Sequence, residues 1–176
     1  MQSREIRLKR YPNGMPVPED FALAEVAVPE PGPGQVAVRN LFLSVDPYMR
    51  GRMNPGRKSY VPPFELGKAL SGDAVGRVVA SRDGRFPVGA HVLSFNGWRE
   101  GFVAEAKHLE AIEPEGIPPS AFLGILGMPG LTAYGGLAEK KFTTLAEAKK
   151  PQALTLDPAG AVLVYDNVAQ RVLRFK

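Results

Sequence analysis

Turn-forming residues divide this chain into short segments, and they constrain its fold more than any other feature. Glycine occurs 19 times and proline 17 times among the 176 residues, and ten of the prolines lie between Pro12 and Pro63. Proline has no N–H to donate, so it interrupts helices and sheet ladders. The two residues together stay below the share typical of low-complexity chains. The sequence therefore predicts a globular fold of many short strands joined by turns.

The residues between these turns form short β-branched or alternating runs. Near-regular spacing of such runs is typical of a barrel or a sandwich, so a mainly β fold is expected. Gly76 lies inside one run, where it indicates a bulge or the close approach of another backbone. Asp46 and Pro47 favour the start of a turn or a short helix. The expected strands are 25–28, 35–45, 74–80, 89–95 and 101–106.

The pattern changes after Pro118. The sequence favours a helix over 119–126, a break at the Gly-Met-Pro-Gly segment 127–130, and a second helix over 131–139. Residues 140–150 are basic and rich in alanine and threonine, which favours a connector or a short helix. Three further strands are then expected to form a C-terminal meander, at 153–156, 161–165 and 171–175.

The absence of cysteine excludes several kinds of chemistry. No disulfide, thiolate zinc site, iron–sulfur cluster or cysteine nucleophile is possible. The two histidines, His91 and His108, lie on expected strand segments and cannot complete a tetrahedral site, so no metal is predicted. A reducing compartment fits this composition, and the cytoplasm is the expected location.

The charge and hydropathy patterns exclude two classes of partner. The formal net charge is +4, from 22 basic and 18 acidic residues. The basic residues do not alternate with aromatic ones, so no nucleic-acid binding is expected. No run of about 18 apolar residues occurs, so no membrane partner is expected. The first ten residues are polar and lack a following apolar run, so no secretory signal is expected.

Residues 32–37, Gly-Pro-Gly-Gln-Val-Ala, match the letters of a dinucleotide-binding fingerprint. That fingerprint must follow a strand and open a helix, because the helix N-terminus meets the pyrophosphate. Here the segment lies in a proline cluster and precedes an alternating β run. We therefore interpret it as a plain turn.

Two segments are more specific. The first is Leu-Ser-Val-Asp-Pro-Tyr-Met-Arg-Gly-Arg-Met at 43–53, followed by 59–67, and the second is Leu-Gly-Met-Pro-Gly-Leu-Thr-Ala-Tyr-Gly-Gly-Leu at 126–137. With the intervening 71–79 and 95–100, they resemble the medium-chain dehydrogenase/reductase superfamily. The resemblance covers about residues 3–139. The chain resembles the zinc-independent branch of that superfamily, which contains the leukotriene B4 12-hydroxydehydrogenase/prostaglandin reductases and the alkenal double-bond reductases.

The resemblance implies a GroES-like β-barrel on the substrate side of an NADPH-dependent ene-reductase. In that family a hydride passes from NADPH to the β-carbon of an α,β-unsaturated ketone or aldehyde. Tyr48 matches a tyrosine near the substrate cleft, and Met128, Pro129 and Thr132 match the segment beside the nicotinamide. The zinc ligands of other relatives are absent here, which agrees with a metal-free site.

The resemblance ends after Glu139, where a strand and a glycine-rich turn are expected but do not occur. We therefore expect the Rossmann domain of the family to be missing, and NADPH not to bind tightly to this chain alone. Residues 151–175 resemble one NHL-type propeller repeat. The expected organisation is a GroES-like barrel at 1–123, the start of the inter-domain helical segment at 124–139, and a connector with a β-rich tail at 140–176.

Other interpretations of these residues remain open. Tyr48 could be a core aromatic residue whose hydroxyl contacts a backbone carbonyl, and Met128 could fill a gap in a core. The chain could also be a non-catalytic remnant or interaction module that uses an exposed cleft and the tail strands for protein contact. Without a covering domain, Tyr48, Met128, Pro129 and Leu131 are expected to leave an apolar face open, so self-association through this face or the tail strands is a further possibility.

Overall fold

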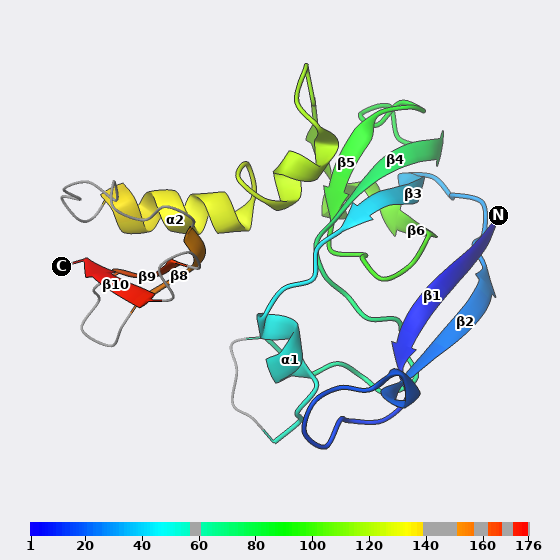
Figure 1. Cartoon of the computed structure of the whole chain (residues 1–176). Helices are drawn as coiled ribbons and strands as arrows, with labels where there is room; N and C mark the ends of the chain where they lie inside the picture. The colour runs from blue at the N-terminus through cyan, green and yellow to red at the C-terminus, as the bar shows by residue number, and fades with distance from the viewer. Residues whose placement is uncertain (57–60, 139–150, 157–161, 167–170, 176) are drawn as a thin grey trace. The chain divides into compact units, whose positions relative to one another are not determined.

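Antiparallel strands are the main regular structure of the first 112 residues, as Figure 1 shows. Strands β1 (Gln2–Leu8) and β2 (Phe21–Ala27) form one pair. A second sheet has the order β6-β3-β4-β5-β7. Its strands are β3 (Gln35–Leu43), β4 (Ala74–Ser81), β5 (His91–Ser94), β6 (Gly101–Glu105) and β7 (Glu110–Ile112). The mainly β fold predicted from the sequence is confirmed.

The structure, a computed structural model, describes residues 1–56, 61–138, 151–156, 162–166 and 171–175. Their contacts divide into two units, Met1–Pro129 and Gly130–Lys176. In the first unit, isolated bridges link the strand pair and the five-stranded sheet to neighbouring segments, at Glu5–Arg99, Arg7–Ala69 and Gly72–Asn96. The ladders therefore do not close into one continuous barrel among the described residues.

Short helices connect the strands. They are the 3₁₀ helices η1 (Pro18–Asp20), η2 (Ala106–His108) and η3 (Pro119–Leu123), and the α-helices α1 (Tyr48–Arg52) and α2 (Met128–Ala138). The turn predicted at 32–34 is present: Gly34 has φ +73° and the Gln35 amide donates to the Gly32 carbonyl at 3.0 Å. The segment thus joins two strands and opens no helix.

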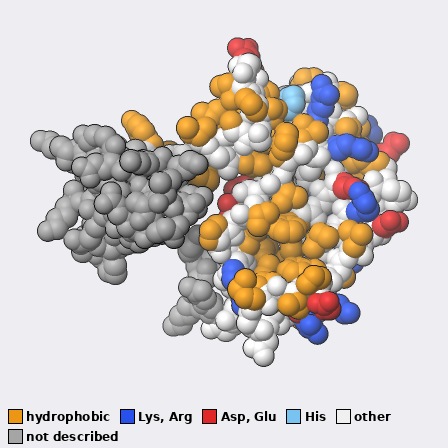
Figure 2. Space-filling view, in the orientation of Figure 1, with side chains coloured by type: hydrophobic (Ala, Val, Ile, Leu, Met, Phe, Trp, Pro, Cys, Tyr) orange, Lys and Arg blue, Asp and Glu red, His pale blue; other side chains and the backbone are white. Residues whose placement is uncertain are grey.

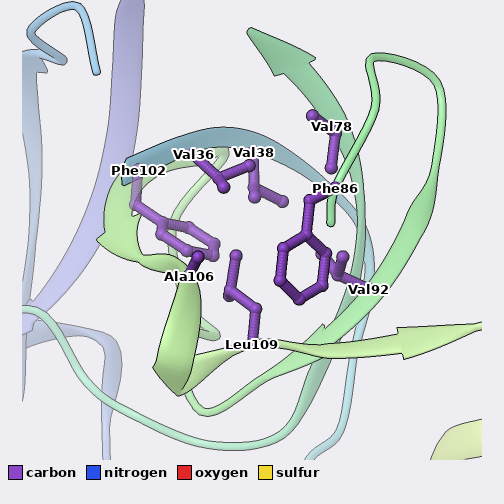
Figure 3. Close-up of a cluster of buried hydrophobic side chains, with 8 residues drawn as sticks. All are labelled: Val36, Val38, Val78, Phe86, Val92, Phe102, Ala106 and Leu109. Atoms are coloured by element: carbon purple, nitrogen blue, oxygen red, sulfur yellow. The ribbon is translucent and has the colours of Figure 1, made fainter. Parts of the chain in front are cut away.

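Two groups of buried apolar side chains stabilise the first unit. The first group, here called the sheet core, lies against the five-stranded sheet, and Figure 3 shows its side chains pointing toward one another. The second, here called the α1 cluster, packs around the short helix α1. The sheet core consists of Val36, Val38, Val78, Phe86, Val92, Phe102, Ala106 and Leu109, and the α1 cluster of Leu8, Met49, Met53, Phe64 and Leu70.

Gly76 of β4 confirms one expectation directly. A Cβ at this position would overlap the Val38 side chain and lie 3.0 Å from the Arg39 carbonyl oxygen. The register of β3 against β4 also shifts between Asn40 and Phe42, beside Gly76. Glycine is therefore required here by the close approach of β3.

Strand β1 is absent from the strands expected from the sequence, because two of its three buried residues are polar. Ser3 and Glu5 are buried, with exposed fractions of 1% and 8%. The Gly101 amide donates to the Ser3 Oγ at 2.9 Å, and Arg7 Nε donates to Glu5 Oε1 at 2.7 Å. These partners replace the apolar alternation that usually marks a strand.

The expected helices after Pro118 are partly wrong. Residues 119–123 form only a 3₁₀ helix. The chain then folds back tightly, and a Cβ at Gly127 would overlap the Phe122 carbonyl oxygen. A break is present at Gly127, but it ends earlier than the predicted 127–130, because α2 already begins at Met128. Pro129 lies in its first turn, where the missing N–H has no helical partner to lose.

The second unit contains the three predicted tail strands. β8 (Pro151–Leu156), β9 (Val162–Asp166) and β10 (Arg171–Phe175) form an antiparallel sheet in the order β10-β9-β8. The connector or short helix expected at 140–150 lies outside the described residues. The domain boundaries at 123 and 139 stay predictions.

Candidate functional site

Helix α1 brings together most of the polar residues of the candidate site. The Met49 amide donates to the Asp46 carbonyl at 3.0 Å, and Ser44 Oγ donates to Asp46 Oδ1 at 2.8 Å. These bonds start the short helix at the position that the Asp-Pro pair predicted. The Ser44 amide also donates to the Asp73 carbonyl at 2.8 Å, so the entry to α1 is tied to the segment before β4.

Tyr48 is the first residue of α1, and it packs against the α1 cluster. Its side chain is half-buried and its hydroxyl oxygen is fully buried. A Cβ placed at Gly72 would lie 3.7 Å from that oxygen and would overlap the Cε of Met49. Gly72 therefore leaves room for the Met49 side chain and lies at van der Waals distance from the Tyr48 hydroxyl. The structure places this group in a dry environment, where a polar contact is stronger than in water.

Arg52 ends α1 and is also buried. Its Nε donates to the Pro62 carbonyl at 2.9 Å, and its Nη1 donates to Ser71 Oγ at 3.0 Å. The guanidinium carbon lies 4.0 Å from the ring centroid of Phe64. Burial lowers the pKa of Arg52, while the neighbouring Tyr48 side chain acts in the opposite direction. Tyr48 and Arg52 are thus electrostatic neighbours on one turn of helix.

Two carboxyl groups lie on the segments next to this pair. Burial raises the pKa of Asp73, and the nearby Asp46 carboxylate raises it further. Oδ2 of Asp46 is buried and has no hydrogen-bond partner among the described residues. Among these residues there is no group of three or more acidic or histidine side chains that could hold a metal ion.

An apolar hollow lies near the bridge between β1 and the 98–100 segment. It has a volume of about 390 Å³. Leu23, Leu41 and Leu43 line it and are 63%, 44% and 40% exposed. Trp98, which also lines it, has φ +60°, a conformation that non-glycine residues rarely adopt. Figure 2 shows apolar side chains gathered on the face turned to the viewer.

The residues predicted to lie near a nicotinamide are on α2. Met128 and Pro129 are exposed at its start, and Thr132 follows Met128 by four residues, on the same side of the helix. Tyr48 lies on α1, so the predicted residues come from two separate elements. Within the described ranges, no glycine-rich turn joins a strand to a helix of the kind that cradles a pyrophosphate. These ranges therefore do not fit the phosphate half of a dinucleotide.

Sequence reasoning missed Arg52 and Asp73. Arg52 stands four residues after Tyr48, a spacing that places two side chains together on a helix, but a five-residue helix gives too weak a pattern to use. Asp73 carries no motif that marks it as buried. Only the structure links Asp73 to the site, because its neighbour Gly72 lies close to the Tyr48 hydroxyl in the folded chain.

Comparison with known proteins agrees with this picture. Residues 4–112 match the family described as the N-terminal domain of oxidoreductase. The chain belongs to this family. The match spans the first ladder and the five-stranded sheet, so this oxidoreductase domain includes α1 and the groups around it.

The relatives of the domain are reductases. The chain is 43% identical over 138 residues to the NADPH-dependent curcumin reductase of Escherichia coli (strain K12), covering 78% of this chain and 40% of the relative. It is 39% identical over 144 residues to the NADP(+)-dependent 2-alkenal reductase of Nicotiana tabacum, covering 79% and 42%. These matches confirm the resemblance to the medium-chain reductases. The resemblance of the tail to a propeller repeat stays a prediction.

A solved structure gives the same result. CurA from Vibrio vulnificus in complex with NADPH matches with a TM-score of 0.71 and 39% identity, over 77% of this chain and 40% of that one. The chain thus spans about two fifths of the length of the proteins that it matches. In the part of the chain that the structure describes, no helix is long and apolar enough to cross a membrane.

Proposed function

We propose that this chain is the substrate-side part of an NADPH-dependent reductase acting on the C=C bond of α,β-unsaturated ketones or aldehydes. The observation that carries the proposal is the buried Tyr48 hydroxyl beside the buried Arg52 guanidinium, within an oxidoreductase domain. Reduction of an enone places negative charge on the carbonyl oxygen. A dry donor next to a fixed cation stabilises such charge.

NADPH, when bound, supplies the hydride that is added to the β-carbon of the substrate. We assign the binding of the phosphate half of NADPH to a part of the enzyme other than the described residues. On this chain, Met128, Pro129 and Thr132 would line the nicotinamide side of the site. Tyr48 would donate to the carbonyl oxygen, and the proton that completes reduction at the α-carbon would come from solvent. No metal is needed in this scheme.

A chimera tests the proposal. Residues 1–129 would replace the matching segment of the E. coli curcumin reductase, and oxidation of NADPH would be followed with 2-alkenals, enones and their saturated counterparts. We expect turnover of the unsaturated compounds only, and a loss of about 10²-fold or more in kcat for Tyr48→Phe, as for removal of an oxyanion donor. A folded chimera that binds NADPH but turns over neither class would refute the proposal and favour a non-catalytic interaction module.

A further inference from the structure

An asparagine followed by a glycine occurs twice in this chain, at residues 13–14 and at residues 96–97. In such a pair the backbone nitrogen of the glycine can attack the side-chain carbonyl carbon of the asparagine. Glycine has no side chain to shield this nitrogen or to restrict the backbone. The attack needs an amide N–H without a hydrogen-bond partner, and room for the chain to bend into a five-membered ring. The structure distinguishes the two pairs in both respects.

The pair at 96–97 is held closed. The Gly97 amide donates to the Gly72 carbonyl at 2.9 Å, and the Asn96 carbonyl accepts a hydrogen bond from Asn40 Nδ2 at 2.8 Å. Gly97 is buried, and a Cβ at this position would lie 2.9 Å from the Gly72 carbonyl oxygen. The attacking nitrogen is thus already bonded and its backbone has little space to rotate. Ring closure here therefore requires local opening of the fold.

The pair at 13–14 lies in the loop between β1 and η1, and it is open. Asn13 and Gly14 are both exposed, and a Cβ at Gly14 would meet nothing beyond its chain neighbours within 4 Å. Among the described residues, none accepts a hydrogen bond from the Gly14 amide. The nitrogen is therefore available for attack, and bending of the loop disrupts no backbone hydrogen bond of that nitrogen.

Gly14 also connects this loop to the candidate site. Its carbonyl accepts a hydrogen bond from Nη2 of Arg50, which lies on α1. The other described charges near this loop include Arg10 and Asp20, which form an ion pair with each other. A change in the backbone just before Gly14 therefore acts on the contact that ties the loop to α1.

We propose that Asn13 is a site of spontaneous deamidation in the folded protein, and that isoaspartate at this position breaks the tie between the loop and α1. A bond forms between the Gly14 nitrogen and Cγ of Asn13, the Cγ–Nδ2 bond breaks, and ammonia leaves with the proton of the Gly14 amide. Water then opens the succinimide at either carbonyl, which gives aspartate or isoaspartate. The net reaction consumes water and releases ammonia.

Isoaspartate changes the loop more than aspartate does. Its backbone runs through the former side chain, so one methylene group is inserted directly before Gly14. It also adds a negative charge next to the residue whose carbonyl Arg50 contacts. This inference concerns the stability of the chain in time and does not depend on the reductase reaction proposed above.

Ageing of the full chain tests the site. Asn13 and Asn96 fall in separate tryptic peptides, 11–39 and 86–99, each of which contains a single asparagine. After incubation at mildly alkaline pH, mass spectrometry measures the conversion of amide to acid in each peptide, and enzymatic methylation detects isoaspartate. We expect conversion at Asn13 to be at least about tenfold faster, because Asn96 reacts only after local opening. In concentrated urea the two rates should converge.

Asn13→Gln is the matched control. Glutamine keeps the amide, but its longer side chain has to close a six-membered ring, which forms far more slowly. Peptide 11–39 of this variant should stay unconverted through the same incubation. Equal rates at Asn13 and Asn96 in the folded chain, or no conversion at Asn13, would overturn the proposed site.

Hydrogen exchange measures the link to α1. In the isoaspartate form, separated from the unmodified chain by ion exchange, we expect the amides of 48–53 to exchange about two- to tenfold faster, as for the loss of one hydrogen bond. The Asn13→Gln chain, aged in the same way, should exchange like fresh wild type. Unchanged exchange at 48–53 in the isoaspartate form would refute the link, even if Asn13 is converted.

Discussion

The sheet core and the α1 cluster lie in the same unit but are built differently. Every member of the sheet core is apolar, and four of its eight residues are valines on paired strands. The α1 cluster relies on Met49 and Met53, whose side chains are flexible, and it is bordered by the buried polar groups of Tyr48 and Arg52.

This difference separates stability from function. A close-packed valine sheet tolerates little change in volume, so it holds the strands in one register. Methionine adapts to irregular space, and a buried cation destabilises the site that contains it. We infer that the sheet core holds the scaffold and that the residues around α1 retain polar groups for chemistry.

Truncation in the sheet core should have the largest effect. Phe102 is 5% exposed, and Phe102→Ala is expected to lower the free energy of unfolding by about 3–5 kcal/mol. Phe42→Ala is the matched control, because Phe42 lies on the adjacent strand but is 44% exposed; its cost should be about 1 kcal/mol or less. Urea unfolding followed by the fluorescence of Trp98, the single tryptophan, measures both. Equal costs would contradict the distinction between core and surface.

Two glycines test the rigidity of the two regions. Gly76→Ala would push a methyl group into Val38 and toward the Arg39 carbonyl, which cannot move freely, so we expect a loss of about 1–3 kcal/mol. Gly72→Ala meets the end of the Met49 side chain, which can turn away. Its cost should therefore be the smaller one. Equal costs in urea unfolding would mean that the α1 cluster is as rigid as the sheet core.

The sequence predicted the sheet core better than the site. Strand positions at 35–43, 74–81 and 91–94 followed from alternation and turn residues, which are local signals. Tyr48 was found only through a resemblance. Arg52 escaped notice because burial of a charged side chain depends on Pro62, Phe64 and Ser71, which contact it only after the chain has folded. Tertiary contacts determine which polar side chains are buried, so composition cannot predict these residues.

Asp73 provides a test of buried charge beside α1. Its pKa is raised by burial and by Asp46, so the folded state resists ionisation of Asp73. Below pH 3.8, the ordinary pKa of the group, Asp73 is protonated in both the folded and the unfolded protein, so its burial costs no stability. Above this pH, Asp73 ionises more readily in the unfolded protein, which lowers the free energy of unfolding. Asp73→Asn should therefore be more stable than the wild type at neutral pH, with the difference vanishing toward acid. A pH-independent difference in urea unfolding would contradict this explanation.

Asp83, in the turn before Phe86 of the sheet core, offers the opposite case and the smallest effect. Arg85 Nε donates to Asp83 Oδ1 at 2.9 Å and Arg85 Nη2 donates to Oδ2 at 2.8 Å, which lowers the pKa of Asp83 to about 2. The resulting stabilisation is present above pH 3.8 and is lost as the pH falls toward about 2. Because the Arg85 side chain is 65% exposed, solvent screens the pair and little stability depends on it.

Arg85→Gln should raise the pKa of Asp83 toward 3.8 but not fully to it, because the backbone amide of residue 85 still donates to Oδ1. Carboxyl-carbon NMR titration measures the change, and Arg82→Gln, an exposed neighbour, is the control. The unfolding free energy at neutral pH should barely move in either variant. A large loss of stability in Arg85→Gln would show that paired surface charge, and not apolar packing alone, supports the sheet core, and the contrast with the α1 cluster would then fail.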